Sequence, residues 1–122
     1  MGEKISGLFA EGERDLSAAI CRLLTKKGCN VDVVNDGVQA YTRFSAKHYD
    51  LLIADRKMPR MPVKEVVDSF KKISGASVII LSDKAKEKLR EDETVGDSLL
   101  FMPFSENTLL SAIRDVTGID LL

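Results

Sequence analysis

Apolar and polar residues follow two alternating periods along this chain. Short apolar runs predict buried strands, and apolar residues spaced three and four positions apart predict amphipathic helices. The predicted strands occupy residues 5–10, 31–34, 50–55, 78–81 and 99–101. Helical patterns lie between most of these runs, and one of them follows Pro62 with an apolar face made of Val63, Val66, Val67, Phe70 and Ile73. Strands that alternate with helices indicate an α/β fold, with a parallel sheet between two layers of helices.

The boundaries of the predicted helices carry the expected start and stop residues. Gly28 and Gly75 each follow a helical pattern, and glycine commonly ends helices. The turn at Gly37 leads into a helix that carries Val38, Tyr41 and Phe44. Ser105 is expected to cap the last helix, whose inward residues are Leu109, Leu110, Ile113 and Val116.

Residues 83–93 depart from this pattern. Only Ala85 and Leu89 are uncharged among the eleven residues of the segment. A helix there can bury little apolar surface and depends on side-chain ion pairs that each contribute only tenths of a kcal/mol. We expect a solvated, weakly held helix, and the alternative is a docking surface for a charged partner.

Composition and charge narrow the functional classes. The chain has 122 residues, of which 44% are hydrophobic and 30% charged, as expected for a single globular domain over residues 1–122. A net charge of −1 gives no reason to expect direct binding of nucleic acid or of an anionic membrane. We find no apolar stretch long enough to cross a membrane. Cys21 and Cys29 lack disulfide or metal-site spacing, which suits a reducing cytoplasm.

Asp55 is the most informative residue, because it ends an apolar run and precedes the turn that contains Met58 and Pro59. Open α/β sheets bind their ligands at the carboxyl ends of the strands. An acid at this position is therefore a candidate site residue.

Asp55, the strand that ends at Ser82 and the Pro103-Phe104 pair before the last helix together resemble response-regulator receiver domains. The resemblance covers nearly the whole chain and implies a flavodoxin-like (βα)5 fold with strand order 2-1-3-4-5. It also implies that Asp55 is the phosphoacceptor and that Ser82 contacts the phosphoryl group. Mg²⁺ would be held by Glu11, by Asp55 and by the backbone carbonyl of Lys57. In receiver domains the bond that matches Met102–Pro103 is cis, and we expect the same here.

The chain departs from the receiver pattern at several site positions. Gly12 stands where the family has a second acid, and Met102 where it has a lysine that pairs with the phosphoryl charge. Leu99 replaces the aromatic residue that receivers use as a switch. Asp83 is expected to repel an incoming phosphoryl group. We therefore predict weak or absent Mg²⁺ binding, and either weakened phosphorylation or an Asp55 that is never phosphorylated.

The resemblance implies a signalling domain and not an enzyme. The expected partners are a histidine kinase or another signalling protein. A homodimer is also possible, through the face formed by the segment from Lys84 to Glu93, the last strand and the last helix. Two alternatives remain open. An aspartyl-nucleophile phosphatase would need an acid two residues after Asp55, where Lys57 stands. A flavodoxin-like ligand binder would need a Gly-rich phosphate loop, but the turn at Glu11 is acidic.

Overall fold

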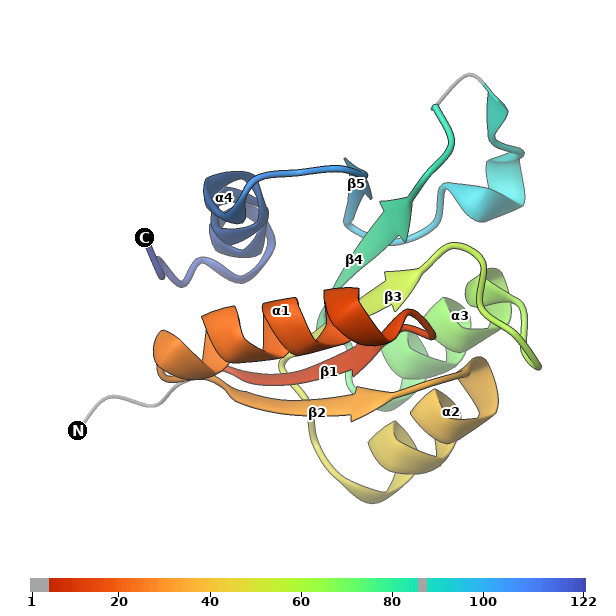
Figure 1. Cartoon of the computed structure of the whole chain (residues 1–122). Helices are drawn as coiled ribbons and strands as arrows, with labels where there is room; N and C mark the ends of the chain where they lie inside the picture. Colours follow the sequence, from red (N-terminus) through yellow and green to blue (C-terminus); the bar gives the residue numbers. More distant parts are fainter. Residues whose placement is uncertain (1–4, 86–87) are drawn as a thin grey trace.

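A five-stranded parallel sheet forms the centre of the protein in the computed structural model, which describes residues 5–85 and 88–122. The strands lie in the order β2-β1-β3-β4-β5, as the receiver resemblance implies (Figure 1). Their bounds are Ser6–Ala10 for β1, Asn30–Val34 for β2, Leu51–Asp55 for β3, Ser77–Ser82 for β4 and Ser98–Phe101 for β5. The predicted strands are therefore confirmed within one residue at each end.

The two faces of the sheet bury different side chains because successive residues of a strand point to opposite sides. Phe9 and Ile53 pack on the face covered by α1 (Arg14–Lys26) and α4 (Glu106–Thr117). Leu8 and Leu52 pack on the opposite face, beneath α2 (Gly37–Ala46) and α3 (Val63–Ile73). Figure 1 shows these two helical layers on either side of the sheet. Strands buried on both faces explain why the sequence shows continuous apolar runs.

Side-chain caps fix where several helices begin. Glu13 accepts hydrogen bonds from the backbone N–H groups of Asp15 and Leu16 at the start of α1. Asp36 caps α2, and Ser105 caps α4 as predicted. The expected apolar face of α3 is confirmed except at its end, where Ile73 is half exposed. Ile73 is the last residue of the helix, so the sheet no longer covers it.

The predicted charged helix over residues 83–93 is wrong for the part of the segment that the structure describes. Asp83 and Lys84 form bends, and Glu91–Glu93 forms a 3₁₀ turn, η2. The segment has too few apolar residues to make a buried stripe, so helix formation gains little from packing. Two of its acids instead bind an arginine at the end of β3, as described below.

The strand β5 lies at the open edge of the sheet, next to β4 alone. Surface hollows of about 430 Å³ and 390 Å³ border β5, one lined partly by Phe101 and the other partly by Leu100. The peptide bond between Met102 and Pro103, just after this strand, is cis, which confirms the prediction.

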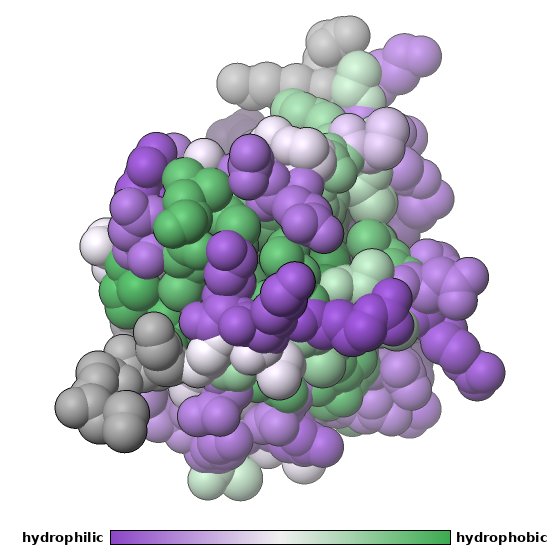
Figure 2. Space-filling model, turned by 60° about the vertical axis from the view of Figure 1, so that its left-hand side comes forward, coloured by the Kyte–Doolittle hydropathy of each residue, from purple (hydrophilic) through white to green (hydrophobic). Residues whose placement is uncertain are grey.

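The molecular surface mixes both kinds of side chain. Figure 2 shows hydrophobic areas on one face, interrupted by hydrophilic side chains. Among residues 5–85 and 88–122, no helix is both long and apolar enough to cross a membrane.

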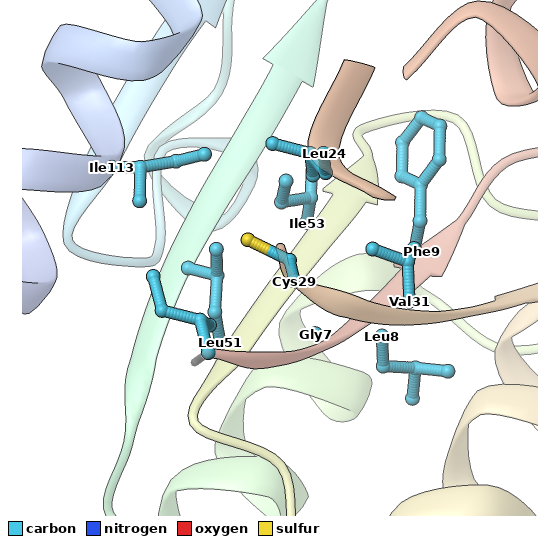
Figure 3. A pocket seen from close by; sticks show the side chains of 10 residues that line it. Gly7, Leu8, Phe9, Leu24, Cys29, Val31, Leu51, Ile53 and Ile113 are labelled. Atoms are coloured by element: carbon cyan, nitrogen blue, oxygen red, sulfur yellow. The ribbon is translucent and has the colours of Figure 1, made fainter. Parts of the chain in front are cut away.

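One small cavity lies inside the apolar layer beneath α1. Its volume is about 10 Å³, and its lining includes Cys29, Ile53 and Ile113 (Figure 3). This volume is close to the minimum for one water molecule, and the lining is almost wholly apolar. The cavity has no room for a flavin or a similar ligand.

Candidate functional site

The sheet register brings Glu11 and Asp55 together at the carboxyl ends of β1 and β3. Ala10 of β1 pairs with Ala54 of β3, so the next residue of each strand lies at the same level. Glu11 is anchored by its backbone N–H, which donates to the carbonyl oxygen of Val34 at 3.0 Å. Two of the predicted site carboxylates therefore lie side by side, as the sequence suggested.

Glu11 is buried, with 5% of its surface exposed. Its Oε2 atom accepts a hydrogen bond from the backbone N–H of Glu13 at 3.0 Å, but its Oε1 atom has no donor among the described residues. The pKa of Glu11 is raised to about 8, mainly by burial and in addition by a hydrogen-bonding interaction with the neighbouring carboxyl of Asp55. Two carboxylates can share a hydrogen bond only when one is protonated. The pair therefore needs either a proton or a cation.

Asp55 is half-buried at the end of β3. Its Oδ1 atom accepts a hydrogen bond from the backbone N–H of Lys57 at 2.7 Å. This bond holds the backbone of Lys57 close to the carboxylate of Asp55.

The donor set fits a small hard cation but is incomplete. Magnesium prefers oxygen ligands in an octahedral arrangement. Glu11 and Asp55 supply carboxylates, Gly12 supplies none, and Glu13 is already used as the cap of α1. Among the described residues, no group of three or more acids, histidines or cysteines could hold a metal ion. A cation here would depend on two carboxylates, a carbonyl and water.

Ser82 is fully buried at the end of β4 and its hydroxyl is already engaged. The Oγ atom donates to the carbonyl oxygen of Lys84 at 2.9 Å and accepts from the backbone N–H of Lys84 at 3.0 Å. Contact with a phosphoryl group would require Ser82 to give up the bond that it donates to Lys84.

Met102 directly follows β5, at the position where the receiver pattern has a lysine. Its backbone N–H donates to the carbonyl oxygen of Ser82 at 2.8 Å, and its partly buried side chain packs against the apolar cluster beneath α1 and α4. A thioether there fills space and contributes no positive charge.

The carboxylate of Asp83 is held by two cations. Its Oδ1 atom lies 2.9 Å from Arg56 Nη2, and its Oδ2 atom lies 2.8 Å from Lys57 Nζ. The hydrogen bonds from Lys57 and Arg56 lower the pKa of Asp83 to about 2. The sequence suggested an acid that would repel a phosphoryl group, but two neighbouring cations offset its charge.

Arg56 was not singled out from the sequence, although it is a central residue of the site. Only 6% of its side chain is exposed, and its Nη1 atom donates to Glu93 Oε2 at 2.7 Å. Arg56 thus ties both Asp83 and Glu93 to the end of β3. The sequence does contain an arginine directly after a predicted buried strand and an acid-rich segment further along the chain. Which acids pair with this arginine depends on the fold, so the sequence alone did not reveal the ion pairs.

The other side of the loop after Asp55 is held against α2. The backbone N–H of Gly37 donates to the carbonyl oxygen of Pro59 at 3.1 Å. A Cβ atom on Gly37 would lie 2.7 Å from the Cβ atom of Met61, so the contact requires glycine. Arg60 adopts a left-handed backbone with φ of 75°. The loop is therefore fixed on both sides, by α2 and by Arg56.

Comparison with known proteins decides the family. A sequence model of the response regulator receiver domain matches residues 8–114. The chain belongs to the response regulator receiver domain family. It is a receiver domain of the kind found in two-component systems, and such domains generally accept phosphoryl groups and are not enzymes.

Individual relatives show the same type of domain in different proteins. The chain is 31% identical to the probable transcriptional regulator ycf29 of Pyropia yezoensis, over 94% of this chain and 54% of that protein. It is 34% identical to the sensor protein EvgS of Escherichia coli K12, over 96% of this chain but 10% of that protein. The receiver domain therefore spans about half or less of these curated relatives.

The fold of the receiver domain also matches solved structures. The receiver domain of the sensor histidine kinase PA1611 from Pseudomonas aeruginosa PAO1 superposes with a TM-score of 0.85 at 20% identity, covering 96% of this chain and all of that chain. That structure contains a magnesium ion coordinated in its active-site cleft.

Proposed function

We propose that Asp55 is the phosphoacceptor of this receiver domain. The observation that carries the proposal is the pair formed by Asp55 and the buried Glu11, whose Oε1 atom lacks a donor among the described residues. In the reaction, one carboxylate oxygen of Asp55 bonds to phosphorus while the bond from phosphorus to the donor's leaving atom breaks, and that atom, a nitrogen of phosphohistidine or an oxygen of acetyl phosphate, takes the electron pair.

A magnesium ion is the cofactor that suits these residues. Glu11, Asp55 and the backbone carbonyl of Lys57 would hold it, and it would neutralise charge on the phosphoryl oxygens. The magnesium-bound receiver domain of PA1611 supports this assignment, because its fold is the same.

We propose that the site is weakened compared with receivers that have a full set of polar residues. Gly12 contributes no carboxylate, and the apolar Met102 contributes no cation. Ser82 must exchange a hydrogen bond with Lys84 before it can contact a phosphoryl group. Each feature lowers the stability of the phosphorylated state relative to the free state.

The output of the domain is proposed to be association with a histidine kinase, with another signalling protein or with a second copy. The proposed face contains the edge strand β5, the helix α4 and the described part of the segment from Lys84 to Glu93. An edge strand presents unpaired backbone groups, which favour association. Phe101 supports the proposal because 39% of its surface is exposed on this strand.

Incubation with Mg²⁺ and acetyl phosphate, followed by intact-mass measurement, tests the phosphoacceptor. We expect a partial gain of one phosphoryl group in the wild type and none in Asp55→Asn. An unchanged wild-type mass at saturating donor would contradict phosphorylation of Asp55. A gain that persists in Asp55→Asn would place the phosphoryl group elsewhere.

A further inference from the structure

Two adjacent cations, Arg56 and Lys57, bind the same carboxylate next to the proposed phosphoacceptor. Both donate to Asp83, which directly follows Ser82 at the end of β4. The backbone of Lys57 also donates to Asp55 Oδ1 at 2.7 Å. The ammonium group of Lys57 is therefore tethered two residues from Asp55 and reaches across to the end of the neighbouring strand.

A phosphoryl group on Asp55 would add negative charge beside Glu11 and would favour a nearby cation. A phosphoryl group carries about −1.5 to −2 charges near neutral pH in its ester form. Hydrogen bonds between ionised groups are stronger than those between neutral groups. Met102 cannot supply a cation from β5, because its side chain is apolar and packs against the core.

Lys57 is better suited than Arg56 to move toward that charge. The guanidinium of Arg56 is buried and is bound by Asp83 and Glu93 together. The side chain of Lys57 is 62% exposed and has Asp83 as its ion-pair partner. Exposed ion pairs contribute little stability, so exchanging Asp83 for a more highly charged partner meets little resistance.

Asp83 would keep a partner after such an exchange. Its Oδ1 atom remains 2.9 Å from Arg56 Nη2, whose position is fixed by burial and by the second bond to Glu93. Losing Lys57 therefore leaves no unpaired carboxylate.

We propose that Lys57 supplies the cation that pairs with the phosphoryl group of phosphorylated Asp55, and that Asp83 binds this ammonium when Asp55 is unmodified. The inference rests on the proposed role of Asp55 as phosphoacceptor. It makes Lys57 a binding residue through its side chain, in addition to the metal contact proposed for its backbone carbonyl.

The test compares the rate at which the full chain gains a phosphoryl group from acetyl phosphate and Mg²⁺, measured by intact mass. We expect Lys57→Met to lower the rate at least tenfold and Lys57→Arg to keep it within about threefold. Lys64→Met is the matched control. Lys64 lines the same hollow as Lys57 but pairs with Asp68, so its loss should leave the rate within twofold.

A double variant that moves the positive charge to another position separates a binding role of Lys57 from a structural role. Placing a lysine at the end of β5 with Met102→Lys should restore most of the rate in the Lys57→Met background. A structural defect caused by Lys57→Met would not be repaired by a cation on another strand. Urea denaturation of each variant checks that the compared proteins are folded.

The outcomes distinguish this inference from the proposed function. A wild type that gains no phosphoryl group contradicts the role of Asp55, and the role of Lys57 falls with it. A wild type that is phosphorylated, with Lys57→Met equally fast, overturns the inference alone. A loss in Lys84→Met but not in Lys57→Met would also overturn it, because the cation would then come from the exposed Lys84.

Discussion

Arg56 and Glu93 are 37 residues apart in the sequence, and their side chains meet in a buried ion pair of 2.7 Å. The backbone N–H of Arg90 also donates to Glu93, and this bond together with Arg56 lowers the pKa of the Glu93 carboxyl. The pair connects the end of β3, where Asp55 lies, with the 3₁₀ turn before β5. It holds a segment that has almost no apolar side chains to anchor it.

Removing Arg56 should destabilise the fold. In Arg56→Met, the side chain of Glu93, only 10% exposed, loses its short 2.7 Å contact with a guanidinium and keeps only the longer one to Arg90 at 3.9 Å. Breaking a buried ion pair from one side is destabilising, and urea denaturation should show a lower free energy of unfolding. The matched control is Lys64→Met, which breaks the exposed pair with Asp68 and should change the stability much less. Equal stability of the two variants would contradict the role of the pair.

The stability of the metal-free protein should fall as the pH rises from about 5 to 8. The pKa of Glu11 is 4.5 without its folded environment and about 8 within it, so the folded state holds a proton that the unfolded state releases. The contribution is present in full below the unfolded value and is lost as the pH rises through about 8, at no more than about 1.4 kcal/mol per pH unit.

Other shifted acids do not act in this pH window. The pKa values of Asp32, Asp83 and Glu93 are lowered, so their contributions are lost only at more acidic pH. Urea denaturation at a series of pH values in the presence of a chelator measures the trend. Glu11→Gln should flatten it, and an unchanged slope in this variant would assign the effect to another group.

Adding the absent carboxylate should strengthen Mg²⁺ binding. A Cβ atom on Gly12 would meet the carbonyl oxygen of Asn35 at an ordinary 3.7 Å, so the backbone tolerates a side chain at this position. We expect the wild type to saturate only above about a millimolar, and Gly12→Asp to bind at least tenfold more tightly, about 1.4 kcal/mol. Amide NMR titration measures both affinities. Gly12→Ala separates the added carboxylate from the added side chain, and equal affinities of the two variants would argue against a magnesium site here.

Replacing Arg60 by glycine should stabilise the protein. Arg60 has φ of 75°, a left-handed conformation that costs a residue with a Cβ atom about 1–2 kcal/mol. The entropy that glycine loses on folding offsets part of this gain. The ion pair of Arg60 with Asp36 is long, at 3.7 Å, and contributes little. Thermal unfolding should show a net gain of about 0.5–1 kcal/mol for Arg60→Gly. Arg60→Ala keeps the Cβ atom and should show none.

The sequence predicted the features that depend on local patterns. The apolar runs located the strands, and the acid that ends the third run located Asp55 as a candidate site residue. Ser105 was identified as a cap because capping depends on residues within one turn. The receiver resemblance added the strand order and the cis bond before Pro103.

The features that were missed depend on contacts between distant segments. The charge-rich segment was expected to be helical because its pairs were assumed to be local, but Asp83 and Glu93 bind Arg56 instead. Asp83 was expected to repel a phosphoryl group because its two cationic partners, Arg56 and Lys57, are distant in the sequence. The positive φ of Arg60 also left no signal, because arginine does not favour that conformation. The roles assigned to Ser82, Met102 and Lys57 remain predictions.

The ion pairs of Arg56 with both Asp83 and Glu93 have a consequence for how the sequence of this domain can change during evolution. A lineage that replaces Arg56 alone keeps two acids without their common partner, and one that replaces Glu93 alone keeps a buried guanidinium with an unmatched donor. Substitutions at these three positions should therefore be inherited together. In an alignment of close homologues, we expect positions 56, 83 and 93 to covary, while position 64 varies freely.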